Sequence, residues 1–152
     1  MNKDEYYMHL ALKEAQKAYK KDEVPIGCII VKNNKIISKA YNKKESKNIS
    51  TYHAEILAIE KACKKEKTWH LEDCIMYTTV EPCMMCTGAI INSRIKTVYY
   101  GCKDPKGGAL ESNIKIKEIK NINHYPNIIQ GNHEKECSQI LKTFFKNKRL
   151  PR

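Results

Sequence analysis

The stretch Val80–Ala89, VEPCMMCTGA, places two cysteines three positions apart directly after a proline. Proline is tolerated in the first turn of a helix because an N–H at that position would have no partner, and it biases the preceding residue toward an extended conformation. We therefore expect a strand that ends near Glu81 and a helix that opens near Pro82. Cys83 and Cys86 would then lie one turn apart on one face of that helix, which suits two ligands of one tetrahedral ion.

The cysteine pair alone is also compatible with disulfide exchange, because a C-x-x-C motif at a helix start occurs in both kinds of site. A second motif upstream, YHAEI at Tyr52–Ile56, favours a metal. His53 and the two cysteines make three ligands, and Zn²⁺ with three protein ligands keeps a fourth position for water, as catalytic zinc does. Glu55 is not needed as a ligand, so it is the candidate proton carrier.

The spacing of His53 and Glu55 restricts how both can face one metal ion. In a regular helix, positions i and i+2 point to different sides. We therefore expect His53 at the first position or the cap of its helix, where the backbone is not yet helical. A lone histidine or a lone helix glutamate is usually a surface or core residue without chemistry, but H-x-E together with P-C-x-x-C is the signature of zinc nucleobase deaminases.

The composition is that of an ordinary globular chain. Its 152 residues suffice for one core, so we expect a single domain over residues 1–152, with 41% hydrophobic and 30% charged residues. A net charge of +11 favours phosphate-rich partners such as nucleic acid, although a lysine-rich surface alone also produces it. With no signal-like segment and no apolar run approaching the ~20 residues of a membrane span, we expect a cytoplasmic protein with no membrane partner. The seven cysteines then indicate reduced thiols and metal ligands.

Hydrophobic periodicity predicts strands that alternate with helices, which is typical of an α/β domain around one sheet. The expected helices are Asp4–Tyr19, His53–Lys65, Pro82–Ser93 and Glu134–Lys148. The expected strands are Val24–Val31, Lys35–Tyr41, Cys74–Thr79, Lys96–Gly101 and Asn127–Gly131, with a hairpin turn at Asn33 and Asn34 and polar loops at Asn42–Asn48 and Cys102–Gly108.

Over nearly its whole length the chain resembles the bacterial tRNA-specific adenosine deaminases, within the zinc-dependent cytidine and deoxycytidylate deaminase superfamily. The segments that carry the resemblance are VPIGCIIV, YHAEILAI, EPCMMCTGAIINSRI, YGCKDPKGG and the ending FFKNKR. The resemblance implies a three-layer α/β/α fold, with a central mixed five-stranded sheet and helices on both faces. It also implies a homodimer with one Zn²⁺ per chain. Such an enzyme converts adenosine to inosine at the wobble position of a tRNA anticodon, here expected in an arginine tRNA.

The resemblance also implies roles for individual residues. Zn²⁺ on His53, Cys83 and Cys86 would activate a water molecule that attacks C6 of adenine, and Glu55 would move the protons. The implied substrate-binding residues are Asn42, Ile26, Ala54, Lys106, Phe144, Phe145 and Arg149. Arginine and aromatic side chains suit the unstacked bases of an anticodon stem-loop. At helical spacing, one of the two phenylalanines is also expected in the core.

Two departures from the family pattern and three alternative functions remain. The segment Leu110–Asn113, LESN, replaces a smaller serine-containing turn, and Cys102 stands where a smaller residue is common.

A deaminase of free bases or nucleotides, such as cytosine, guanine or dCMP, would share every metal ligand. A thiol oxidoreductase would not need His53 or Glu55. A zinc-stabilised binding module would close the fourth position with a further thiol such as Cys74. The basic surplus and the FFKNKR ending favour the tRNA enzyme.

Overall fold

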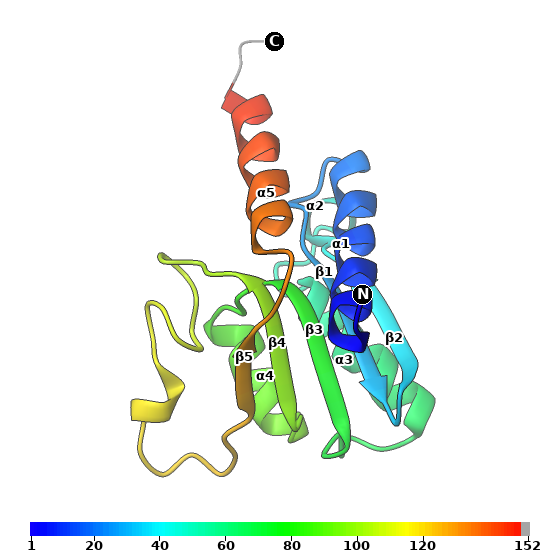
Figure 1. Cartoon of the computed structure of the whole chain (residues 1–152), viewed down its shortest axis with the longest axis vertical. Coiled ribbons are helices and arrows are strands. Elements are labelled where there is room, and N and C mark those ends of the chain that lie inside the picture. The colour runs from blue at the N-terminus through cyan, green and yellow to red at the C-terminus, as the bar shows by residue number, and fades with distance from the viewer. Residues whose placement is uncertain (150–152) are drawn as a thin grey trace.

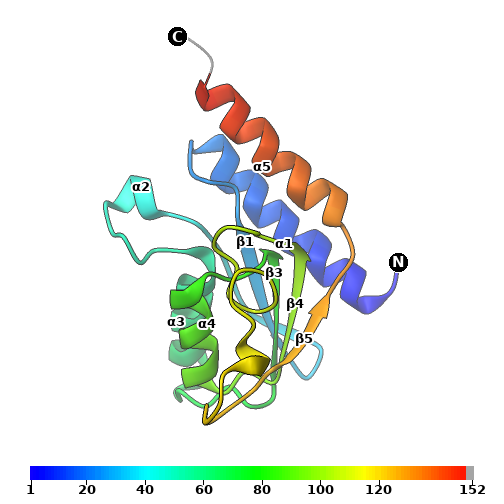
Figure 2. The same cartoon turned by 90° about the vertical axis from the view of Figure 1, so that its left-hand side faces the viewer.

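A computed structural model describes residues 1–149, which form one five-stranded mixed sheet between two layers of helices (Figures 1 and 2). The last three residues of the expected domain, 150–152, lie outside the described residues. In chain order the elements are α1 (Lys3–Lys20), β1 (Gly27–Lys32), β2 (Lys35–Tyr41), α2 (Lys44–Lys47), α3 (Ala54–Glu66), β3 (Cys74–Val80), α4 (Met84–Ser93), β4 (Thr97–Cys102), η1 (Ile116–Glu118), β5 (Asn127–Gln130) and α5 (Glu134–Arg149).

The sheet has the strand order β2-β1-β3-β4-β5. β1 is antiparallel to both β2 and β3, whereas β3, β4 and β5 run parallel to one another. In Figure 2, α1 and α5 cover one face and α3 and α4 the other. The expected α/β/α fold with a mixed five-stranded sheet is therefore confirmed. Among residues 1–149, no helix has both the length and the apolarity needed to cross a membrane.

The hairpin of β1 and β2 forms where it was expected. Asn33 and Asn34 both have positive φ, at 50° and 63°, and asparagine tolerates this left-handed backbone better than most residues. Two such residues in a row match the twist of the flanking strands. The return strand Lys35–Tyr41 is confirmed with the expected bounds.

The start of β1 differs from the expectation. The strand was expected from Val24 but begins at Gly27, because the Ile26 N–H donates to the Val24 carbonyl at 2.9 Å and turns the chain before the ladder begins. Gly27 then lies directly beneath α1. A Cβ at this position would lie 2.0 Å from the Ala11 carbonyl oxygen, so only glycine lets the helix pack on the strand at this distance.

Alternating residues of β1 supply both cores. Cys28 and Ile30 face α3 and α4, whereas Ile29 and Val31 face α1 and α5. All four are at most 2% exposed. Burying each large aliphatic side chain contributes about 1.5–3 kcal/mol relative to exposure. This two-sided burial explains why β1 is an uninterrupted apolar run.

Three chain segments converge at one edge of the sheet. β2, β3 and β4 point the same way, because β1 is antiparallel to both of its neighbours. The segments that follow these strands therefore lie at the same edge, where ligands bind in open α/β sheets. They are residues 42–53, residues 81–83 and residues 103–112. The first was expected to be a polar loop at Asn42–Asn48, but it contains the short helix α2.

Candidate active site

α4 begins slightly later than expected. Pro82 was expected in its first turn, but Cys83 is the N-cap, with an extended backbone at φ −73° and ψ 178°, and Met84 is the first helical residue. The Thr87 N–H donates to the Cys83 carbonyl at 2.8 Å and closes the first turn. Cys83 and Cys86 are still one turn apart, as the sequence predicted.

His53 is the N-cap of α3, as its spacing from Glu55 required. Its backbone is extended, at φ −73° and ψ 153°, and Ala54 is the first helical residue. The side chain of an N-cap residue usually accepts a hydrogen bond from its own helix. Neither His53 nor Cys83 makes such a bond. The two side chains are therefore available to each other.

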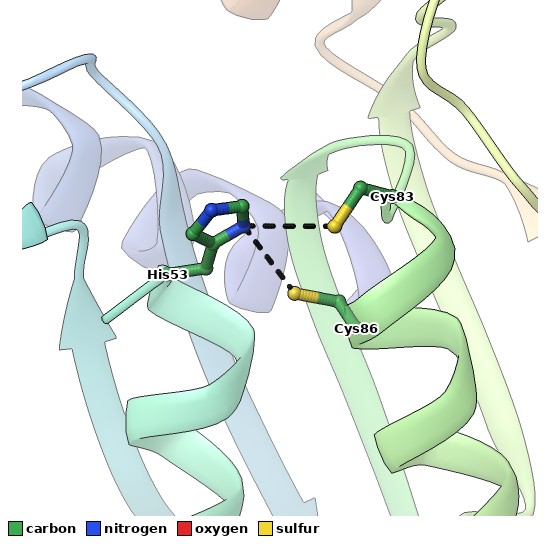
Figure 3. Close-up of side chains that lie close together, drawn as sticks. All are labelled: His53, Cys83 and Cys86. Atoms are coloured by element: carbon green, nitrogen blue, oxygen red, sulfur yellow. Dashed lines mark hydrogen bonds between the residues drawn. The ribbon is translucent and has the colours of Figure 1, made fainter. Parts of the chain in front are cut away.

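The three expected ligands meet between the starts of α3 and α4 (Figure 3). His53 Nδ1 lies 3.6 Å from Cys83 Sγ and 3.6 Å from Cys86 Sγ. Zinc with bonds of about 2.0 Å to nitrogen and 2.3 Å to sulfur in a tetrahedron separates these atoms by about 3.5 Å, close to the observed distances. The residues therefore fit Zn²⁺.

The ligand group has three members among residues 1–149. Cys74, which could have closed a structural site, is the first residue of β3 and is not part of the group. Three nitrogen and sulfur ligands leave one coordination position free, as in catalytic zinc sites. This arrangement disfavours the zinc-stabilised binding module.

A hydrogen bond between the two thiols shifts their pKa values in opposite directions. The hydrogen bond from Cys86 is the largest cause that lowers the pKa of Cys83, to about 4. The same bond, together with burial, raises the pKa of Cys86 far above its usual value. A hydrogen bond to Cys83 also raises the pKa of His53. A metal cation that binds both sulfurs displaces the proton of the hydrogen bond between them, so metal affinity falls as the pH is lowered.

Glu55 is a neighbour of this group as the second residue of α3, with 3% of its surface exposed. Its Oε1 atom is buried and has no hydrogen-bond partner in the described chain. Burial is the main cause that raises the pKa of Glu55 to about 7. An unpaired buried oxygen costs about 1–3 kcal/mol, which marks a residue kept for something other than stability. A carboxyl group with a pKa near neutrality can both accept and return a proton.

The chain is similar to known proteins over nearly its whole length. The family model for MafB19-like deaminases matches residues 1–149. The tRNA-specific adenosine deaminase of Bacillus subtilis (strain 168) is 44% identical over 149 residues, which are 98% of this chain and 92% of that protein. This chain belongs to the tRNA-specific adenosine deaminases. The Rickettsia bellii (strain RML369-C) member is 46% identical over 141 residues, covering 91% of this chain and 97% of that one.

Solved structures agree with this assignment. A structure from studies of A-to-I editing by tRNA:A34 deaminases at the wobble position of transfer RNA matches with a TM-score of 0.87 at 40% identity. The match covers 90% of this chain and 99% of the chain in that structure. A guanine deaminase from Bacillus subtilis matches with a TM-score of 0.65 at 31% identity. This match covers 100% of the present chain and 98% of the guanine deaminase chain. The resemblance predicted from the sequence is confirmed.

The residues expected around the base lie at the same edge of the sheet. Ala54 is fully buried at the start of α3, and Ile26 packs against both cores just before β1. Asn42 is buried, its Nδ2 donates to the Val24 carbonyl at 3.3 Å, and its Oδ1 accepts from the Lys44 N–H at 3.1 Å. The amide still has one free donor and one free lone pair, so binding of a nucleoside by Asn42 stays a prediction.

The residues expected to contact RNA divide into exposed and buried ones. Phe144 is 6% exposed and packs edge-on against Tyr19 of α1, so it is the phenylalanine that belongs to the core. Phe145 is 40% exposed, and Arg149 and Lys106 are also exposed. Phe145 and Arg149 line a groove of about 460 Å³ between α5 and the segment after β4 that carries Lys106. RNA contact by these residues stays a prediction.

The sequence offered little indication of the part that Glu81 plays in the structure. Glu81 was expected only to end β3, yet it is 2% exposed and its carboxylate binds the segment that follows β4. The available signal was a charged residue inside a buried apolar context, directly before the proline and the first cysteine. Its partners are distant in sequence, so the pattern did not identify them.

Proposed function

We propose that this deaminase converts adenosine to inosine at the wobble position of an arginine tRNA. In this proposal one Zn²⁺ per chain is held by His53, Cys83 and Cys86, and Glu55 carries the protons. Deamination of tRNA adenosine follows from membership of the family. The observation that carries the residue roles is the buried, unpartnered Oε1 of Glu55 close to three side chains that are spaced for a tetrahedral ion.

The reaction replaces the 6-amino group of adenine by oxygen from water and releases ammonia. When bound, Zn²⁺ supplies the Lewis acidity that makes a water molecule nucleophilic near neutral pH. Glu55 accepts a proton from the attacking water at Oε1 and delivers it to N1 of the ring. The same carboxylate then moves the second proton of the water to the departing amino group. A pKa near 7 suits both transfers, because neither protonation state is strongly favoured.

The basic surface supports RNA as the substrate rather than a free base. The net charge is +11, and the groove between α5 and the segment after β4 has Lys103, Lys142 and Arg149 beside the exposed ring of Phe145. Positive side chains with an aromatic face suit a single-stranded loop, whose bases stack while its phosphates are neutralised. We also propose that the protein is located in the cytoplasm and forms a homodimer.

The test measures conversion of an arginine anticodon stem-loop by the zinc-loaded protein. We expect adenosine at the wobble position to become inosine, detected by mass spectrometry of the nucleosides. A stem-loop with that adenosine moved by one position is the matched control and should stay unconverted. Because binding energy from remote parts of a substrate accelerates the chemistry, free adenosine should react at least about 100-fold less efficiently.

Guanine and cytosine serve as competing substrates in the same assay, since a guanine deaminase shares the fold at 31% identity. Turnover of either free base at the rate of the stem-loop would contradict the proposal and favour a free-base deaminase. Stem-loop binding should also weaken steeply with added salt, because neutralised phosphates release counterions.

A further inference from the structure

Glu81 binds both ends of the segment 104–112, which we call the tip loop. Its Oε1 accepts from the Asp104 N–H at 3.2 Å and from the Ser112 hydroxyl. Its Oε2 accepts from the N–H groups of Leu110, Glu111 and Ser112 at 3.1, 2.8 and 3.0 Å. One buried carboxylate thus holds the beginning and the end of an otherwise irregular loop.

The tip loop passes very close to this carboxylate. A Cβ at Gly108 would lie 2.4 Å from Glu81 Cδ and 2.6 Å from the Asp104 carbonyl oxygen, so a larger residue would displace the loop. The Ala109 N–H donates to the Pro82 carbonyl at 2.9 Å. The loop is therefore anchored on the two residues that directly precede Cys83.

The same loop reaches the surface that we assign to RNA. Lys106 lies in the exposed part of the tip loop, and its N–H donates to Asp104 Oδ1 at 3.2 Å. The neighbouring Pro105 lines the groove that also contains Phe145 and Arg149. Glu81 therefore lies between a metal ligand and a candidate RNA-contacting loop. Its five bonds come from four backbone N–H groups and one hydroxyl, so it fixes the path of the chain and not a single side chain.

We propose that Glu81 is a positioning residue for RNA recognition, which holds the tip loop at a fixed place relative to the metal ligand Cys83. Lys106 and the groove then meet the anticodon loop at the distance that brings the target adenine to the metal centre. The inference rests on the proposed function, because it assigns a role in binding the same tRNA substrate. Leu110 of the tip loop packs in one core, but residues 104–108 belong to neither core, so the part of the loop that carries Lys106 can loosen without opening the core.

The main test compares Glu81→Gln with Glu72→Gln. Glu72 is an exposed glutamate near the other end of β3, and its substitution removes the same charge. Removal of a negative charge alone strengthens RNA binding. A glutamine amide keeps one acceptor oxygen, but its NH2 group would face the N–H groups that now point at the other oxygen. We therefore expect Glu81→Gln to raise KM for the stem-loop about tenfold with kcat within about threefold, and Glu72→Gln to change neither by more than about twofold.

A second readout does not depend on catalysis. Amide hydrogen exchange over residues 104–112 should become at least about tenfold faster in Glu81→Gln and stay unchanged in Glu72→Gln, because protection reports local opening. Affinity for a stem-loop with guanosine at the target position should fall in parallel with the rise in KM. Zinc content should stay at one ion per chain.

Three results would overturn the inference. A merely structural role would lower kcat while KM stayed constant, and unchanged exchange in the tip loop would show that Glu81 does not hold it. Weaker RNA binding by Glu72→Gln to the same extent would show that the effect does not depend on the bonds between Glu81 and the tip loop. If wild-type protein does not convert the stem-loop, the proposed function fails, whereas the exchange experiment still decides whether Glu81 anchors the loop.

Ser112→Ala keeps the inference testable if Glu81→Gln does not fold. This change removes one of the five hydrogen bonds, and Ser112 is only partly buried. We expect KM to rise about two- to threefold with kcat unchanged, together with faster exchange at residues 110–112. Unchanged KM and unchanged exchange in this variant would refute the positioning role.

Discussion

Glu55 and Glu81 each lie two residues from a candidate metal ligand, and they are 3% and 2% exposed. Burial tends to raise the pKa of both. For Glu81 the bonds from Glu111, Ser112 and Asp104 outweigh burial and hold the pKa below its usual value. For Glu55, whose Oε1 has no partner, burial prevails and the pKa rises to about 7. Hydrogen-bond partners thus decide whether a buried carboxylate here can anchor a loop or carry a proton.

The largest expected effect separates the two glutamates by activity. Glu55→Gln keeps the shape of the side chain but cannot carry a proton, so kcat for the stem-loop should fall by about 10³-fold. Zinc content should remain one ion per chain, measured by elemental analysis. If this variant lost both zinc and fold, Glu55 would be a structural residue and the comparison would fail.

Metal removal should affect the candidate metal centre and the tip loop differently. A chelator should abolish activity and lower the free energy of unfolding by about 3 kcal/mol relative to protein at a free zinc concentration 100-fold above Kd. The tip loop should keep its slow hydrogen exchange, because Glu81 holds it without the ion. Loss of protection over residues 104–112 on chelation would show that the metal, and not Glu81, fixes the loop.

The same substitution at the two positions should have different effects on stability. Glu81→Gln leaves buried N–H donors without an acceptor, so the free energy of unfolding in urea should fall by about 2–3 kcal/mol. Glu55→Gln should leave it within about 1 kcal/mol of wild type or raise it, because a buried carboxylate with one unpartnered oxygen is replaced by a neutral group. Equal losses in both variants would contradict the distinction drawn from their partners.

Glu23 offers a third buried carboxylate with the smallest expected effect. It is fully buried, and its two oxygens accept from the Glu45 and Ser46 N–H groups at 2.9 and 2.6 Å. Burial would raise its pKa, but these bonds lower it. Glu23→Gln should lower the free energy of unfolding by about 1–2 kcal/mol at pH 7.

The pH dependence of that loss tests its cause. Because the folded pKa of Glu23 lies below the usual value of 4.5, its contribution is fully present above pH 4.5. The contribution is lost as the pH falls through the folded pKa, where the native carboxylate also becomes protonated. Urea unfolding of Glu23→Gln and wild type should therefore converge below pH 4.5. A difference that stays constant with pH would assign the loss to packing.

Local patterns were sufficient to predict where Glu55 and the candidate metal ligands lie. The Asn33-Asn34 turn set the return strand of the hairpin, and the spacing of His53 and Glu55 required His53 to be a cap. The ligand group then followed from one short motif at the start of each helix. These features depend on residues that are near one another in the chain.

Features that depend on distant partners were not predictable. Glu81 binds residues 23–31 positions away, in a loop whose path no periodic pattern indicates. The short helix α2 is likewise held by Glu23, more than 20 positions upstream. β1 begins later than expected because of a local turn at Val24–Ile26, a detail that apolar composition alone does not reveal.

α3 and α4 both begin at the candidate metal centre, with His53 and Cys83 as their N-caps. The peptide dipoles of a helix add up to about half a positive elementary charge at its N-terminus, so two such ends place on the order of one fixed positive charge beside the sulfurs. Peptide dipoles cannot rotate away or titrate as a lysine can. Part of the positive charge at this site therefore resides in the backbone, where no change of pH removes it and no single substitution deletes it.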